Sequence, residues 1–361
     1  MRRQIPILMA VLTLATARAT TLFTDAIPAS SNGAPLTWLD RETTAATTLT
    51  LSRTPDGDDT IAVIPPGGRV DVLFVDETGN CLVKTPFGIT GWAQARAGAD
   101  SGETFPALAL RHDDRLATDL YYLPELGKPL DNHYYYTEAE PDTPAPGLPP
   151  ENTADETGPV SEIFDRLLET ALAPGGTRYN IDCTVSLSGQ HYCLLLPTAD
   201  KIRRSGVAGL FGQAFYLPGN GHVYSDVDDS SSRYYRARQK WSVQDGAMLE
   251  TEQPYHYLGL ASSYRGQYDP EHGSHDKQIP LHLTDRAGGN KTVAEIAPGA
   301  KVTLLLADPH QPCARTAQNG NTCADLWLLL QTTDGTTGWV KINYSKKTPD
   351  LEGLHGFANN P

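Results

Sequence analysis

Two stretches far apart in the chain carry the same order of apolar and polar positions. Thr60–Phe74 reads TIAVIPPGGRVDVLF, and Thr292–Leu306 reads TVAEIAPGAKVTLLL. Further along each copy, GITGWA at Gly88–Ala93 returns as GTTGWV at Gly335–Val340. The apolar runs are short and broken by Pro-Gly turns, which is typical of β-strands. The sequence therefore predicts that one small β module occurs twice.

One stretch between the two copies has a different period. Ser161–Ala173 reads SEIFDRLLETALA, and its apolar residues recur at the spacing of one helix face. Ser161 is a suitable N-cap, and Pro174-Gly175-Gly176 would end the helix. We therefore expect one amphipathic helix here, with Ile163, Phe164, Leu167, Leu168 and Ala171 on its apolar face.

The remaining sequence divides the chain into segments. Apolar runs and hairpin turns such as Gln244-Asp245-Gly246 follow the expected helix and predict a β-meander. The run Asp269–Asp276 reads as a polar hinge. The expected organisation is a leader (1–19), a first module (37–97), a Tyr-rich segment with an acidic Pro-rich linker (98–158), a central helix-plus-meander domain (159–268), a second module (279–345) and a polar tail (346–361).

The first residues read as a secretory signal. Arg2 and Arg3 precede the apolar stretch Ile5–Ala17, and Ala17-Arg18-Ala19 is an A-x-A cleavage site. The apolar stretch is well below the roughly 20 residues that a membrane span needs. An exported, periplasmic protein without a membrane span is predicted.

The charge of the mature chain limits its partners. Removing the three arginines of the leader from the 29 basic residues leaves 26 against 43 acidic ones, a net charge near −17. Such a surface repels phosphate backbones, so nucleic-acid binding is not expected. It also offers no basic patch for anionic lipid head groups.

The cysteines form two pairs of equal spacing and one remainder. Cys183 and Cys193 stand ten positions apart, as do Cys313 and Cys323. In an oxidising compartment each pair is expected to form a disulfide bond that closes a hairpin or loop. Cys81 is left over and aligns with Leu328 of the second copy, which predicts a buried, unreactive thiol.

Both modules resemble the bacterial SH3-like (SH3b) domain. The shared pattern is I-x-x-I-P-P-G-G-x-V-x-V-L, a strand ending V-K-T, and then G-x-T-G-W; Ile61–Leu73, Val83–Thr85 and Gly88–Trp92 carry it in the first copy. Phe215–Leu260 is similar to an uncharacterised β segment that precedes SH3b modules in some envelope proteins. The resemblance implies a mainly β fold: two small SH3-like barrels plus a central β-meander domain with the amphipathic helix. It also implies binding of peptidoglycan or of envelope proteins and peptides.

Catalytic motifs are absent from the sequence. It contains no G-x-S-x-G elbow, no H-E-x-x-H and no phosphate-binding loop. His191 lies near Cys193, but a disulfide explains that cysteine better than a catalytic thiol does. We therefore expect a non-catalytic protein.

Two polar clusters have residue types that can bind metal ions. Glu271, His272, His275 and Asp276 place two imidazoles and two carboxylates in six residues, and Asp226, Asp228, Asp229 and Ser230 place carboxylates at alternate positions. The first reads as a solvated loop and the second as a polar hairpin turn without the Gly and distal Glu of a calcium loop. No metal and no cofactor is predicted.

Aromatic residues are the candidates for ligand contact. Those with a possible role in a binding groove are Trp92, Trp339, Trp327, Tyr344 and Tyr224, each with a structural alternative in a core. The favoured function is an exported binding or scaffold protein of the bacterial cell envelope, with peptidoglycan or an envelope protein as its partner. Two alternatives stay open: a wall-active hydrolase with a site in the central domain, and an inhibitor or immunity protein whose acidic surface meets a basic enzyme.

Overall fold

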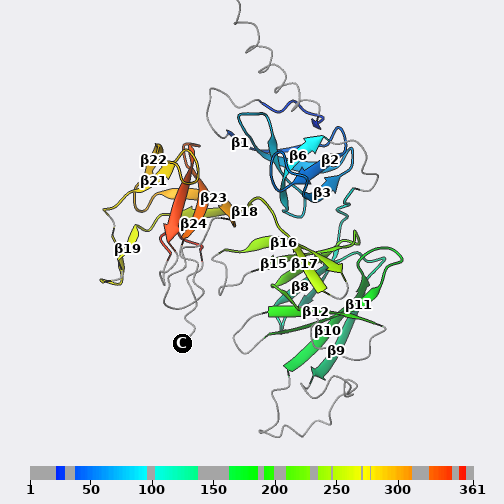
Figure 1. Ribbon diagram of the computed structural model, residues 1–361. Coiled ribbons are helices and arrows are strands. Elements are labelled where there is room, and N and C mark those ends of the chain that lie inside the picture. Colours follow the sequence, from blue (N-terminus) through cyan, green and yellow to red (C-terminus); the bar gives the residue numbers. More distant parts are fainter. Residues whose placement is uncertain are drawn as a thin grey trace, which may run out of the picture. The chain divides into compact units, whose positions relative to one another are not determined.

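The computed structural model shows a mainly β protein (Figure 1). It describes residues 22–28, 37–95, 102–136, 162–185, 191–198, 209–227, 235–244, 247–269, 271–276, 278–310, 325–343 and 349–354. The chain forms two compact units. The first unit comprises Met1–Glu103, Ser230–Tyr235 and Glu252–Pro361, and the second comprises Thr104–Asp229 and Arg236–Thr251.

The first unit contains two six-stranded sheets with the same strand order. The first sheet consists of β1 (Thr37–Thr44), β2 (Leu49–Ser52), β3 (Thr60–Ile64), β4 (Arg69–Val75), β5 (Cys81–Lys84) and β6 (Thr90–Ala95), in the order β1-β4-β5-β6-β2-β3. The second sheet consists of β18 (His256–Ser263), β21 (Leu281–Thr284), β22 (Thr292–Ile296), β23 (Lys301–Asp308), β24 (Asp325–Thr332) and β25 (Thr337–Asn343), in the order β18-β23-β24-β25-β21-β22. The duplication in the sequence is thus a duplication of topology.

The two sheets also share their irregularities. The pairing of β1 with β4 shifts register between Trp38 and Arg41, and that of β18 with β23 shifts between Tyr257 and Leu260. Asp40 and Gly259 occupy the same position in these two bulges, and both have a positive φ, 43° and 58°. Such bulges are features that the sequence must specify, so their repetition supports a common origin of the two modules.

Two expectations about the modules change. Within the described residues both strand orders are open, and neither sheet closes into a barrel. The second module also takes its first strand, β18, from the stretch that the sequence assigned to the central domain (159–268). Between β18 and β21 it carries an additional two-stranded hairpin, β19 (Gln267–Asp269) and β20 (Ser274–Asp276), where the sequence suggested a hinge.

A short segment from near one end of the chain extends each module at the same position. In the first module, Thr24 N donates to Thr44 O and Ala46 N donates to Leu22 O. In the second, Glu352 N donates to Ser263 O and Arg265 N donates to Asp350 O. The central residues of these bridges, Phe23 and Leu351, are buried. Part of the expected polar tail is therefore docked on the second module.

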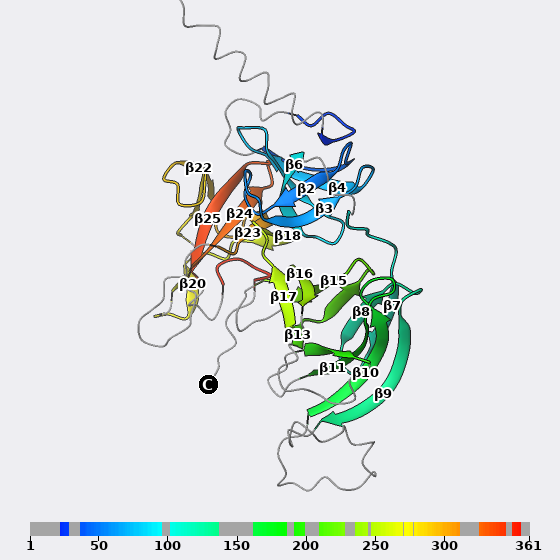
Figure 2. The same ribbon diagram turned by 45° about the vertical axis from the view of Figure 1, so that its right-hand side comes forward.

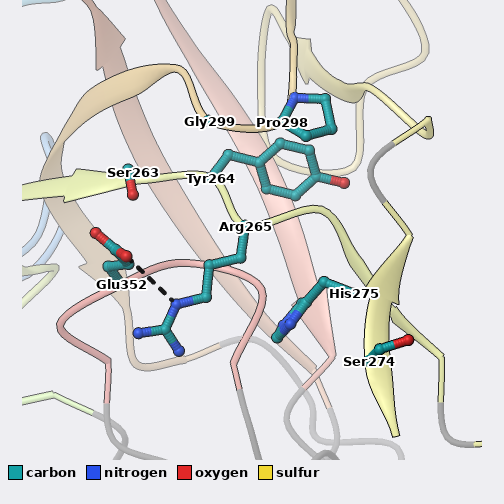
Figure 3. Close-up of a pocket in the computed structure, with 8 residues that line it drawn as sticks. All are labelled: Ser263, Tyr264, Arg265, Ser274, His275, Pro298, Gly299 and Glu352. Atoms are coloured by element: carbon teal, nitrogen blue, oxygen red, sulfur yellow. Dashed lines mark ion pairs between the residues drawn. The ribbon is translucent and has the colours of Figure 1, made fainter. Parts of the chain in front are cut away.

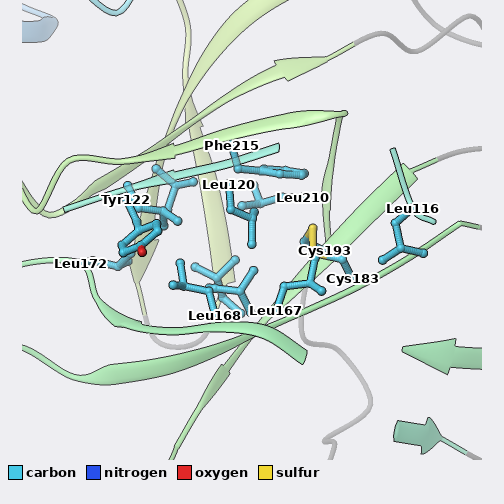
Figure 4. Close-up of a cluster of buried hydrophobic side chains, with 14 residues drawn as sticks. Leu116, Leu120, Tyr122, Leu167, Leu168, Leu172, Cys183, Cys193, Leu210 and Phe215 are labelled. Carbon is cyan, nitrogen blue, oxygen red and sulfur yellow. A yellow bond between two sulfur atoms is a disulfide. The ribbon is translucent and has the colours of Figure 1, made fainter. Parts of the chain in front are cut away.

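The second unit is a sandwich of two sheets. One has the order β13-β12-β11-β10-β9 and the other β17-β16-β15-β14-β8-β7. The strands are β7 (Ala109–Asp113), β8 (Thr118–Tyr122), β9 (Lys128–Tyr136), β10 (Glu162–Ala171), β11 (Arg178–Val185), β12 (His191–Pro197), β13 (Gly209–Phe211), β14 (Ala214–Leu217), β15 (His222–Val227), β16 (Ala237–Gln244) and β17 (Ala247–Thr251). Leu120 and Phe215 of one sheet face Leu167, Leu168 and the cysteine pair of the other in a shared core (Figure 4).

The expected helix at Ser161–Ala173 is wrong, because Glu162–Ala171 forms strand β10. Figure 2 shows β10 as a long strand running beside β9 and β11, with which it pairs along its length. Its pairing shifts between Arg166 and Leu168, and this bulge places Leu167 and Leu168 in the sandwich core, whereas Phe164 packs in a separate cluster with Leu194 and Leu196. A bulged strand with apolar neighbours on both faces reproduces the spacing of a helix face.

Candidate functional site

A cavity of about 640 Å³ opens in the second module, where β18 ends. It is lined by Ser263, Tyr264, Arg265, Ser274, His275, Pro298, Gly299 and Glu352 (Figure 3). Four stretches of the chain build it: the end of β18, the inserted hairpin β19–β20, the turn before β23, and the docked segment near the C-terminus. Such a concave place with several polar groups is a candidate binding site.

Strand alternation decides which side chains face the cavity mouth. Tyr264 and Leu351 are paired across the bridge, and both are buried. Their neighbours therefore point the other way, which places Arg265 and Glu352 on the solvent side, where their side chains reach toward each other (Figure 3).

Two pairs of polar side chains at the cavity are too far apart for hydrogen bonds. Arg265 Nε lies 3.7 Å from Glu352 Oε1, and the two side chains are 37% and 53% exposed. His275 Nε2 lies 4.0 Å from Asp350 Oδ1. Both distances exceed that of a hydrogen bond. His275 is 15% exposed, and its Nε2 is buried without a hydrogen-bond partner among the described residues.

The wall of the cavity beneath these charges is apolar and fixed. The Tyr264 hydroxyl donates to Ile279 O at 3.0 Å. Burial raises the pKa of Tyr264 to about 12, and the nearby Asp350 and Asp276 charges act in the same direction. The phenol is therefore neutral at physiological pH. Tyr268 packs edge-on against the His275 ring at 5.4 Å, and Asp350 Oδ1 accepts a hydrogen bond from Tyr268 N at 2.8 Å.

The first module provides an internal comparison for this site. The positions of Ser263, Tyr264 and Arg265 are taken there by Thr44, Ala45 and Ala46, and that of Glu352 is taken by Thr24. Pro66 and Gly67 correspond to Pro298 and Gly299. The two modules thus share the backbone at this position, whereas the charged and aromatic side chains belong to the second module.

The tryptophans expected at a binding groove lie in a core instead. Trp92 and Trp339 are 7% and 3% exposed, which agrees with the structural alternative, burial in a core, that the sequence left open for both. Trp327 is half-buried against the same cluster. The cluster joins four residues of each module at equivalent positions: Leu73, Phe74, Leu82 and Trp92 with Leu305, Leu306, Leu329 and Trp339.

The two modules contact each other through residues at equivalent positions. Trp38 stacks on Tyr257 with ring centroids 6.5 Å apart and an interplanar angle of 6°. These two residues are the second positions of the equivalent strands β1 and β18. Thr90 N donates to Gln253 Oε1 at 2.8 Å, which ties the first sheet to the segment leading into β18. The aromatic residues therefore hold the two modules together.

The other expected contact residues do not form a groove with these. Tyr224 is fully buried in the second unit, where its hydroxyl accepts a hydrogen bond from Asn220 Nδ2 at 3.0 Å. Tyr344 lies outside the described residues. The sequence pattern gave no sign of the cavity, because its lining comes from four separate stretches of the chain.

The cysteines agree with expectation where the structure describes them. Cys183 and Cys193 are direct cross-strand partners in β11 and β12 and form a disulfide. Cys81 is free and buried, and burial raises the pKa of its thiol to about 12, with a further contribution from Asp76. Its reactive thiolate is therefore scarce at neutral pH. Cys313 and Cys323 lie outside the described residues.

Described residues of the two polar clusters considered for metal binding make other contacts. His272 Nδ1 contacts Asp269 Oδ2 at 2.5 Å on the surface of the hairpin, whereas His275 points to the cavity. Asp226 is held by the guanidinium of Arg238, and Asp228, Asp229 and Ser230 lie outside the described residues. Among the described residues, no group of three or more His, Cys, Asp or Glu side chains is placed to hold a metal ion.

Buried carboxylates in the second unit are engaged by arginines. Asp182 receives two hydrogen bonds from Arg166, at 2.7 and 2.8 Å, and Asp165 is paired with Arg115. Asp165 is adjacent to Arg166 in β10, so the two carboxylates lie on opposite faces of the sheet. They do not converge as an acid–base pair would.

Comparisons with known proteins add no relative: no protein family, no curated protein and no solved structure matches the chain. In the described part of the chain, no helix has the length and apolar character to cross a membrane.

Proposed function

We propose that this protein is a non-catalytic, exported binding or scaffold protein of the bacterial cell envelope, which binds peptidoglycan or an envelope protein through its SH3-like modules. The observation that carries the proposal is the repeated six-stranded module with the same strand order and the same bulge. The sequence pattern of both copies resembles a module whose usual role in the envelope is binding.

The two copies have different tasks in this proposal. Their equivalent aromatic faces are used for contact with each other. The cavity at the end of β18 remains open and bears charged side chains that the first copy lacks. The second module is therefore the ligand-binding copy, and the first is its structural partner.

Export to the periplasm is part of the proposal. The leader 1–19 and the disulfide Cys183–Cys193 support it, because disulfides persist in oxidising compartments. The described residues of the first docked segment, 22–28, lie after the expected cleavage site, so cleavage there would leave them intact.

Incubation of the purified mature protein with peptidoglycan sacculi tests the proposal. The protein is expected to co-sediment with the sacculi and to release no soluble muropeptides. An acidic protein of unrelated fold controls for trapping. Failure to co-sediment with sacculi, together with failure to capture any protein from an envelope extract, would refute the binding role. Release of muropeptides that is lost in an Asp165→Asn or Asp182→Asn variant would show an enzyme.

A further inference from the structure

We infer that the cavity of the second module binds a zwitterionic amino-acid group of a peptide, with Arg265 binding its carboxylate and Glu352 its ammonium group. The inference rests on the proposed envelope-binding function and names the ligand chemistry of that site. Wall peptides supply such groups wherever a diamino acid remains uncross-linked.

The loose ion pair is the first support. At 3.7 Å, Arg265 and Glu352 attract each other without a hydrogen bond, and both are substantially exposed. Separating such a pair costs little, since exposed ion pairs contribute little free energy. The guanidinium fork is then available to a carboxylate in the two-bond geometry that arginine prefers, and Glu352 to a cation.

The surroundings fit a small polar ligand on an apolar base. Ser263 and Ser274 belong to the lining, and Tyr264 and Pro298 provide apolar surface. The mature chain is strongly acidic, so a purely anionic ligand would be repelled at long range. A zwitterion has no net charge and avoids that repulsion, and the adjacent positive and negative groups match it.

A second exposed ion pair in the same unit is within hydrogen-bond distance and serves as a comparison. Arg53 NH1 lies 2.7 Å from Glu252 Oε2, with side chains 40% and 57% exposed. The exposure is nearly that of Arg265 and Glu352, but the atoms are in hydrogen-bond contact. No cavity-lining residue takes part in that pair. Arg53 is therefore a matched control position for Arg265.

Calorimetric titration of the full mature protein tests the inference. The probe is the wall tripeptide L-alanyl-D-glutamyl-meso-diaminopimelate, compared with forms in which its diamino acid is amidated at the carboxylate or acetylated at the amine. Arg265→Gln and Glu352→Gln are each expected to weaken tripeptide binding roughly tenfold or more. Arg53→Gln should bind the tripeptide as tightly as the wild type does. Both blocked peptides should bind weakly to the wild-type protein.

Several outcomes would overturn the inference. These are no binding of the tripeptide, equal binding by Arg265→Gln, or equal binding of the blocked peptides. The blocked peptides keep the test independent of any folding defect in a variant. Co-sedimentation of the wild type with sacculi is measured in parallel: if it persists while the tripeptide fails, only the assignment of the cavity is wrong, whereas loss of both refutes the proposed wall-binding function too.

Discussion

Single residues in this protein show how the local surroundings set ionisation. His222 at the start of β15 is half-buried, and burial lowers its pKa to about 4, with the charge of Lys240 acting in the same direction. The same cause, burial, raises the pKa of Cys81 and Tyr264. In each case the neutral form is favoured, because a charged form would lose hydration.

The lowered pKa of His222 predicts a pH-dependent stability of the second unit. The unfolded chain takes up the proton near the ordinary pKa of 6.5, whereas the folded chain resists it until about 4. Stability is therefore lost as the pH falls through this window. His222→Gln should reduce the loss, measured by thermal unfolding from about pH 7 to about pH 4. If His222→Gln lost as much thermal stability between the two pH values as the wild type, His222 would not be the cause of the loss.

The shared bulge makes a prediction about backbone conformation. Gly259 has a left-handed φ, and a Cβ added there would lie 2.7 Å from the Tyr257 hydroxyl. Gly259→Ala should therefore lower the free energy of unfolding by about 1–2 kcal/mol, measured by urea denaturation. The matched change in the first module, Asp40→Gly, removes a side chain from a left-handed position and should not destabilise. If Gly259→Ala and Asp40→Gly changed the free energy of unfolding equally, the left-handed backbone at this bulge would not explain the effect of Gly259→Ala.

Among the secondary-structure elements, strand β10 shows how pairing with neighbouring strands decides between helix and strand. The spacing of apolar residues in Ser161–Ala173 fits a helix, yet the stretch is strand β10. Its side chains pack in one apolar cluster on each face of the sheet, and its bulge shifts the alternation. Tertiary pairing therefore overrides local periodicity here, as it often does for short apolar stretches.

The docked segments predict that residues near both ends of the chain stabilise the modules. Leu351 is fully buried on the second module, so Leu351→Ala should cost about 2–5 kcal/mol. Phe23→Ala in the first module should cost a similar amount. Both are measured by urea unfolding, and limited proteolysis should show earlier cleavage in the altered segment. Ala26→Ser, at an exposed position of the first segment, is the control. If Leu351→Ala resisted urea and protease as well as the wild type, the docked segment would not contribute to stability.

At the scale of the whole molecule, the duplicated modules form one unit although more than 150 residues separate their repeated stretches. The cluster around Trp92 and Trp339 draws equally on both copies, and the stack of Trp38 on Tyr257 repeats that equivalence. The acidic Pro-rich linker expected within 98–158 would by itself favour a first module that melts alone. The shared core indicates that the two modules unfold together.

Joint unfolding of the modules is testable with one substitution. Trp92→Ala removes a buried ring from the shared cluster and should cost about 3–5 kcal/mol. Hydrogen exchange should then increase in both β1–β6 and β21–β25, with much less change in the second unit. Protection lost in the first module alone would mean that the modules are independent.

The sequence alone was enough to predict the repeat, the β character of the modules, the cysteine pair of β11 and β12 and the burial of Cys81. These follow from local spacing, since alternation, turn residues and apolar content are properties of short stretches. The tertiary structure decided the rest. It made β10 a strand, gave β18 to the second module, and used the tryptophans to join the modules. It also assembled Arg265, His275 and Glu352 at one cavity from three stretches, because only the pairing of distant strands brings such residues together.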